Sequence, residues 1–400
     1  MPACSANGRS GSQGHGPRCS MAPRTTRSET LGDWQPTGLP DQGWRRPMRV
    51  FRCENCQARV YFNSSVCVKC NARLGFMPEE RTMGAFSMDG LGVLRRYGDA
   101  QSSWRPCANS QNACACGWLV HGKDPNPLCR SCRLTATIPD QGTLENRIAW
   151  RDLEAAKRVW LASMLDLHLP VRSRLDDPVH GLAFHFLRQI DASHPILTGH
   201  DAGDITINAA ESDPVERERS KLALLEPYRT LLGHFRHESG HYYWDLLVRD
   251  SALMQPFRAL FGDERMDYAK ALARHYEHGP APDWQLAHVS GYATMHPWED
   301  WAETWAHYLH MVDLLGTARS WKLSVDAFEP PEISDQSSLS PEFLELIHEW
   351  LPLTLVVNSL NRSLGHADAY PFAFSNVALR KMQFVHDVIR PFSHAGTFPG

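Results

Sequence analysis

From position 143 onward, apolar residues recur every three or four positions over long stretches, the spacing that places them on one face of an α-helix. The first stretch begins at Thr143 and has as its apolar positions Leu144, Ile148, Leu153, Val159, Trp160 and Met164. Asp213-Pro214 and Ser340-Pro341 each predict the start of another helix. Asp or Ser caps the first helical turn, and proline fits the first position of a helix. Further helices are expected from 297 to about 315 and after Ser375.

Two short runs, 181–187 and 204–210, are typical of β-strands and are joined by a turn-rich segment. The second run is short and alternates apolar with polar residues, which predicts a strand at the edge of a sheet. The part from 141 to 400 is therefore predicted to be a mainly helical α+β domain with a small sheet.

Another helical stretch surrounds His237-Glu238-Ser239-Gly240-His241, an HExxH pattern. Pro227 suits a first helical turn, and the apolar positions follow at helical spacing as Tyr228, Leu231, Leu232, Phe235, Tyr242 and Leu246. Positions i and i+4 share one helix face, so the two imidazoles can bind one metal ion, with Glu238 beside a metal-bound water as general base. The alternative is a helix that carries two solvated or packed histidines.

A catalytic zinc ion normally takes three protein ligands, so a third residue is needed. The helix that Pro297 starts offers Glu299 and Glu303 one turn apart; one carboxylate can bind metal while the other accepts the outer N–H of a ligand histidine. Other candidate ligands are His275, His278, His288 and His296, which we interpret as ordinary polar or packing residues. His307 could also lie beside the ligands, but a solvated or packed role is the default.

All eleven cysteines lie at or before position 132. Cys53-x-x-Cys56 and Cys67-x-x-Cys70 have the paired spacing of a zinc ribbon, in which two turns offer four thiolates to one tetrahedral ion. A disulfide-bonded module is the alternative and would require an exported protein.

Five more thiols follow, which exceeds the four that a tetrahedral site uses. They are Cys107, Cys114, Cys116, Cys129 and Cys132. A second structural zinc site is predicted here, with one of Cys114 and Cys116 to spare; a metal-free packed loop is the alternative.

Composition and charge divide the chain further. Residues 1–47 are rich in Gly, Ser, Pro, Arg and Thr, which predicts a disordered basic extension in which Cys4 and Cys19 have no role. Residues 48–140 hold 12 Lys+Arg against 7 Asp+Glu, and residues 141–400 hold 23 against 35. A basic ribbon beside an acidic domain favours docking of one on the other over nucleic-acid binding, because no Lys/Arg run stands out.

With 42% hydrophobic and 22% charged residues, the chain has the composition of a globular protein. It has no apolar run long enough to cross a bilayer and no apolar core of a secretory signal near its start. A cytoplasmic location without membrane contact is therefore expected.

The HExxH pattern followed by a glutamate-bearing helix resembles the gluzincin metallopeptidases, and Tyr-Ala followed by Glu-x-x-Ala-Glu resembles the catalytic domain of anthrax lethal factor. Residues from about 48 to 390 resemble a bacterial family of zinc-binding metallopeptidases with an N-terminal zinc ribbon. The shared stretches are Thr198-Gly199-His200-Asp201, Arg229 through Glu238, and His296-Pro297-Trp298-Glu299-Asp300.

This resemblance implies that Glu299 is the third zinc ligand, that Glu303 supports a ligand histidine and that Tyr292 donates to the oxyanion. It also favours Cys116, in Cys116-Gly117-Trp118-Leu119-Val120, over Cys114 as the ribbon ligand. An edge strand in such peptidases pairs with extended substrate, a role that the 204–210 run would fill.

The favoured function is zinc-dependent hydrolysis of peptides or proteins, with one catalytic and one or two structural zinc ions. The first alternative is a catalytically silent zinc-binding adaptor that holds a protein partner through the ribbon. The second is a nucleic-acid-binding ribbon protein. The intact Glu238 favours the peptidase, since a purely structural metal site does not need a carboxylate beside the water.

Overall fold

A computed structural model of the chain describes residues 50–88, 93–189, 196–223, 226, 228–325 and 336–394. The expected extension at 1–47 and Pro227 lie outside these residues. The described residues all fall within one unit, residues 43–400. Among them, no helix is both long and apolar enough to span a membrane.

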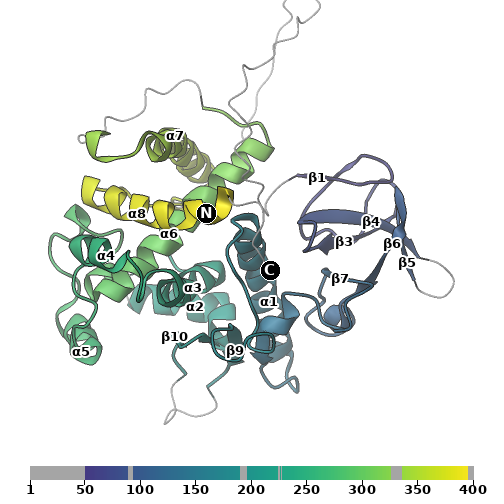
Figure 1. Cartoon of the computed structure of the whole chain (residues 1–400), viewed down its shortest axis with the longest axis horizontal. Helices are drawn as coiled ribbons and strands as arrows, with labels where there is room; N and C mark the ends of the chain where they lie inside the picture. Colours follow the sequence, from purple (N-terminus) through teal and green to yellow (C-terminus); the bar gives the residue numbers. More distant parts are fainter. Residues whose placement is uncertain are drawn as a thin grey trace, which may run out of the picture. The chain divides into compact units, whose positions relative to one another are not determined.

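The N-terminal part consists of short antiparallel strands, and its cysteines lie in the connections between them (Figure 1). Its strands are β1 (Phe51–Arg52), β2 (Arg59–Val60), β3 (Arg73–Met77), β4 (Thr82–Met88), β5 (Leu94–Arg96), β6 (Asp99–Pro106) and β7 (Leu119–His121). β1 pairs with β2, and the other strands form a sheet in the order β3-β4-β5-β6-β7. Phe76 packs its ring against Phe62 and Trp118, with centroids 4.9 and 4.8 Å apart, which gives this part an aromatic core.

The rest of the chain is mainly helical, so the predicted α+β fold class is confirmed. Its helices are α1 (Leu144–Asp166), α2 (Pro214–Ala223), α3 (Leu231–Leu247), α4 (Met254–Phe261), α5 (Tyr268–His278), α6 (Pro297–Ser320), α7 (Pro341–Ser363) and α8 (Asn376–His394). The helical stretch expected from Thr143 is α1, and the side chain of Thr143 caps it by accepting a hydrogen bond from the backbone N–H of Asn146. Ser340 caps α7 in the same way.

The small sheet has the order β10-β11-β9-β8. Its strands are β8 (Thr135–Thr137), β9 (Ala183–Leu187), β10 (Gly199–Asp201) and β11 (Asp204–Asn208). The prediction that the 204–210 run forms an edge is wrong: β11 pairs with β10 on one side and β9 on the other. Ala202 and Gly203 both have positive φ, 46° and 92°, and form a two-residue hairpin turn at the end of the segment that was expected to be a turn-rich link. β10 is thus the outer strand at this edge.

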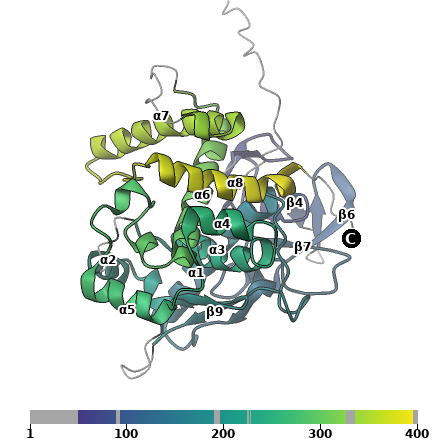
Figure 2. The same cartoon turned by 60° about the vertical axis from the view of Figure 1, so that its left-hand side comes forward.

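Helix α3 packs along α6, and α4 and α8 also pack on α6 (Figure 2). Gly240 permits the close approach of α3, because a Cβ there would lie 3.0 Å from Cα of Ala302. Trp301 on α6 donates its indole N–H to the carbonyl of Gly240 at 2.8 Å. α3 begins later than its apolar spacing suggests, because the side chain of Thr230 caps it through the N–H of Gly233.

Candidate metal centre

Three side chains of the HExxH helix and of α6 converge where the two helices cross. Nε2 of His237 lies 3.0 Å from Oε2 of Glu299, and Nε2 of His241 lies 3.5 Å from Oε1. Together these ligand atoms all lie within 4.8 Å of one another. The predicted carboxylate thus stands between the two histidines, 58 positions downstream of His241 in the sequence.

This donor set fits zinc, which takes two imidazole nitrogens and a carboxylate oxygen in many hydrolytic sites. Glu299 is only 2% exposed and His241 only 3% exposed. A buried carboxylate requires compensating positive charge, which a divalent cation would supply. The site therefore has both the ligand types and the charge balance of a zinc centre.

The outer nitrogen of His237 is held by the next carboxylate along α6. Nδ1 donates to Oε1 of Glu303 at 2.6 Å, and the hydroxyl of Ser290 donates to Oε2 at 2.6 Å. A proton on Nδ1 leaves the lone pair of Nε2 facing Glu299. Nδ1 of His241, by contrast, has no hydrogen-bond partner among the described residues.

Glu238 lies between the two histidines in sequence and is 5% exposed. Burial raises the pKa of its carboxyl group above the ordinary value, against the opposing effect of the two histidines. Such a carboxylate is a stronger base than one in water.

Two phenols stand beside the centre, and the sequence analysis identified one of them. The ring of Tyr292 lies 6.0 Å from that of His237, and burial with nearby Glu299 raises the pKa of Tyr292 far above its usual range. Tyr268, at the start of α5, was missed: its hydroxyl donates to Oε1 of Glu299 at 2.9 Å. No motif marks Tyr268, because it lies 31 positions before Glu299 on a separate helix.

A cavity of about 350 Å³ adjoins the centre. Trp298 forms part of its wall and places its ring 4.0 Å from that of His241. Tyr268 and His200, the latter on the edge strand β10, also line it. Of the tryptophans near the motif, Trp244 shares this wall, whereas Trp301 and Trp305 are fully buried core residues.

The other histidines considered as ligands lie elsewhere. His296 caps α6, because its Nδ1 accepts a hydrogen bond from the N–H of Trp298, and its Nε2 donates to the carbonyl of Met266. His278 is exposed. His288 lies 3.7 Å from Asp300, and His275 packs on the ring of Tyr292. His307 pairs with the hydroxyl of Tyr370. Among the described residues, none of these histidines joins the group formed with Glu299.

The first cysteine cluster brings four thiols together. Sγ of Cys53 lies 3.6 Å from Sγ of Cys70, and the same distance separates Cys56 from Cys67. A disulfide requires about 2.05 Å, whereas four sulfurs around zinc at about 2.3 Å stand about 3.8 Å apart. Backbone N–H groups of Cys70 and Lys69 lower the pKa of the Cys67 thiol, whereas burial raises the pKa of the Cys53 thiol.

The second cluster groups the sulfur atoms of Cys107, Cys116, Cys129 and Cys132, all buried. Sγ of Cys116 lies 3.6 Å from that of Cys129. Cys114 stands outside this set of four, and its sulfur accepts a hydrogen bond from Arg158 at 3.5 Å. The Cys114 sulfur also lies within 4.8 Å of ligand atoms of Cys132 and Glu154, a group that offers three ligands instead of four.

Comparisons with known proteins agree with this arrangement. The model of a family described as "Putative zinc-binding metallo-peptidase" matches residues 146–388, and a zinc-ribbon domain model matches residues 50–143. Uncharacterized proteins of Mycobacterium tuberculosis and Mycobacterium bovis are 43% identical over 345 residues, covering 86% of this chain and 95% of each relative. No solved structure matches, so the likeness to the lethal factor domain stays a prediction, as does the division at 47 and 140.

Proposed function

This chain belongs to the family of zinc-binding metallo-peptidases just described, and we propose that it hydrolyses peptide bonds in peptide or protein substrates. His237, His241 and Glu299 hold the catalytic zinc ion. Glu238 is the general base and Tyr292 the oxyanion donor.

One observation carries the proposal: a single helix, α6, supplies both the carboxylate between the two histidines and the carboxylate on the outer nitrogen of His237. Two histidines that share a helix face by chance would need neither of these carboxylates. This double support is typical of a metal site, in which the outer hydrogen bond fixes the tautomer and the ring orientation.

Zinc held by these ligands would polarise the substrate carbonyl and make a bound water acidic. Glu238 accepts the proton of that water and returns it to the leaving amine, which a carboxylate of raised pKa can do in both directions. The hydroxyl of Tyr292 donates a hydrogen bond to the developing oxyanion. The adjoining cavity takes a substrate side chain next to the scissile bond.

The two cysteine clusters are proposed to hold structural zinc, with Cys53, Cys56, Cys67 and Cys70 at one site and Cys107, Cys116, Cys129 and Cys132 at the other. Thiols that bind zinc instead of forming disulfides fit a reducing compartment, which supports a cytoplasmic location. The ribbon is also proposed as the surface for a protein partner.

The test is digestion of a mixed peptide library by zinc-loaded wild type and by Glu238→Gln, with products identified by mass spectrometry. Glutamine keeps the size of the side chain and removes the base, so we expect new peptide termini with wild type and a loss of at least about a hundredfold with the variant. Cleavage that survives in Glu238→Gln contradicts the assigned base. Absence of cleavage by zinc-loaded wild type favours the silent adaptor.

A further inference from the structure

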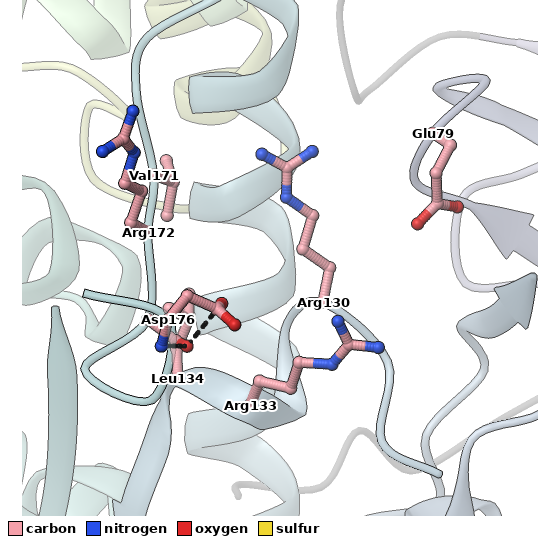
Figure 3. Close-up of a pocket in the computed structure, with 8 residues that line it drawn as sticks. Glu79, Arg130, Arg133, Leu134, Val171, Arg172 and Asp176 are labelled. Carbon is pink, nitrogen blue, oxygen red and sulfur yellow. Dashed lines mark hydrogen bonds between the residues drawn. The ribbon is translucent and has the colours of Figure 1, made fainter. Parts of the chain in front are cut away.

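A second cavity, of about 270 Å³, lies between the last cysteine cluster and the loop that follows α1 (Figure 3). Leu134 and Val171 are buried side chains in its lining, at 2% and 7% exposure. It shares no lining residue with the metal centre or with the cavity that adjoins that centre. Nothing in the peptidase chemistry accounts for it.

Its most unusual group is the guanidinium of Arg130, which comes from the turn between Cys129 and Cys132. Arg130 is partly buried, yet it forms no hydrogen bond or ion pair with any residue that the structure describes. The other two arginines of the cavity are paired: Arg133 with Asp124, and Arg172 with Asp177 at 3.7 Å. A partly desolvated charge without a partner is costly, and a planar guanidinium is suited to bind a carboxylate through two parallel bonds.

The opposite wall is preformed. The hydroxyl of Ser173 donates to Oδ2 of Asp176 at 2.7 Å, and the carbonyl of Ser173 accepts from the N–H of Asp177 at 2.8 Å. Gly181 packs so tightly on this loop that a Cβ would lie 2.4 Å from the Ser173 carbonyl oxygen. A wall fixed in this way loses little conformational entropy when a ligand binds.

The charges select the ligand. Asp124 and Asp177 already neutralise Arg133 and Arg172, so Arg130 is the one lining arginine without an ion pair among the described residues, and Glu79 and Asp176 are the carboxylates of the lining. Figure 3 shows Glu79 on one side of Arg130 and Arg133, and Asp176 with Arg172 on the other. One carboxylate is enough to pair with Arg130, whereas the second charge of a phosphate dianion would face Glu79 or Asp176.

We propose that this cavity binds a small monoanionic carboxylate, of about the size of an amino acid, with Arg130 as the anchoring residue. The site is separate from the peptidase centre and does not depend on peptide hydrolysis.

The experiment is calorimetric titration of the full-length, zinc-loaded protein at low ionic strength with N-acetylglycine, N-acetylglycinamide and inorganic phosphate. The first two differ only in the carboxylate. We expect the acid to bind and the amide to bind at least about tenfold more weakly. Arg130→Gln should weaken binding of the acid by about ten- to hundredfold, as loss of a charged hydrogen-bond partner does.

Arg172→Gln should also weaken binding of the acid, by a smaller factor, while Arg219→Gln on the exposed face of α2 leaves it unchanged. Zinc content should be unchanged in all three variants. Equal binding of acid and amide, no binding of the acid, or full affinity in Arg130→Gln overturns the proposal. Tighter Arg130-dependent binding of phosphate overturns the carboxylate class, and loss of zinc in Arg130→Gln assigns Arg130 to the cysteine cluster instead.

Discussion

Nδ1 of His237 donates to Oε1 of Glu303 at 2.6 Å, although the two residues are 66 positions apart in sequence. Glu303 lies one turn beyond Glu299 on α6, so the helix that provides the proposed third ligand also orients the first. The hydroxyl of Ser290 donates a hydrogen bond to the second carboxylate oxygen of Glu303 and so fixes this side chain in turn.

Replacing this carboxylate should weaken the metal site without removing a ligand. We expect Glu303→Gln to lower the zinc affinity of the peptidase centre by about ten- to hundredfold, because loss of such an outer hydrogen bond has this effect in other zinc sites. Competition with a chelator of known affinity measures it. Glu277→Gln, on the exposed α5, is the matched control, and equal affinities in the two variants would contradict the role.

Mutation of each phenol should distinguish the role of Tyr268 from that of Tyr292. Tyr268→Phe removes the donor to Oε1 of Glu299, so its main effect should be a loss of zinc affinity of about tenfold. Tyr292→Phe should keep the zinc affinity and lower kcat by about a hundred- to a thousandfold, as loss of an oxyanion donor does. Chelator competition and steady-state kinetics on one peptide measure both. Exchanged effects would assign the oxyanion role to Tyr268.

The five thiols of the second cluster allow a direct comparison. Cys116→Ser should lose one zinc ion per chain, because serine replaces one of four grouped sulfur atoms. Cys114→Ser should keep full zinc content, since that thiol is hydrogen-bonded to Arg158 outside the group. Metal analysis of the two purified variants decides the matter. The reverse result would show that Cys114 is the ligand.

The buried carboxylate of Glu211 predicts a pH-dependent stability. Hydrogen bonds from His234 and Arg229 outweigh burial and lower the pKa of Glu211 to about 2 from 4.5, a difference worth roughly 3 kcal/mol. In the unfolded chain the group takes up its proton near pH 4.5, in the folded chain only near 2. The stabilisation is therefore present above about pH 4.5 and is lost as pH falls toward 2.

Glu211→Gln should thus be destabilised at pH 7 by about this amount, with a difference from wild type that shrinks below pH 4.5. Urea unfolding of both proteins between pH 3.5 and 7 measures it. Glu216→Gln, which breaks only an exposed pair with Arg219, should differ from wild type by less than about 1 kcal/mol throughout. A constant difference for Glu211→Gln across this range would contradict the assigned pKa.

The sequence identified those parts of the site that follow from helical spacing. His237 and His241 are four residues apart, Glu299 and Glu303 likewise, and each pair shares a helix face wherever the helix packs. Tyr268 could not be found in this way, because only the tertiary position of α5 brings it to Glu299. The choice of Cys116 over Cys114 came from a resemblance, and spacing alone left it open.

Two predictions from the sequence were wrong, each for a local structural reason. The 204–210 run was expected at a sheet edge, but the turn at Ala202 and Gly203 folds β10 back on it, and β10 lies in a segment that was expected to be only a turn-rich link. The active-site helix was expected from Pro227, yet the Thr230 side chain begins it later. In both cases a backbone or capping preference outweighed the apolar pattern.

The most direct measurement is the number of zinc ions per chain in wild type, His237→Ala and His278→Ala. His278 is an exposed histidine of α5 and serves as the control. If His237, His241 and Glu299 hold zinc, His237→Ala binds one ion fewer than wild type while His278→Ala binds the same number. An unchanged count in folded His237→Ala would contradict the metal centre and, with it, the proposed peptidase.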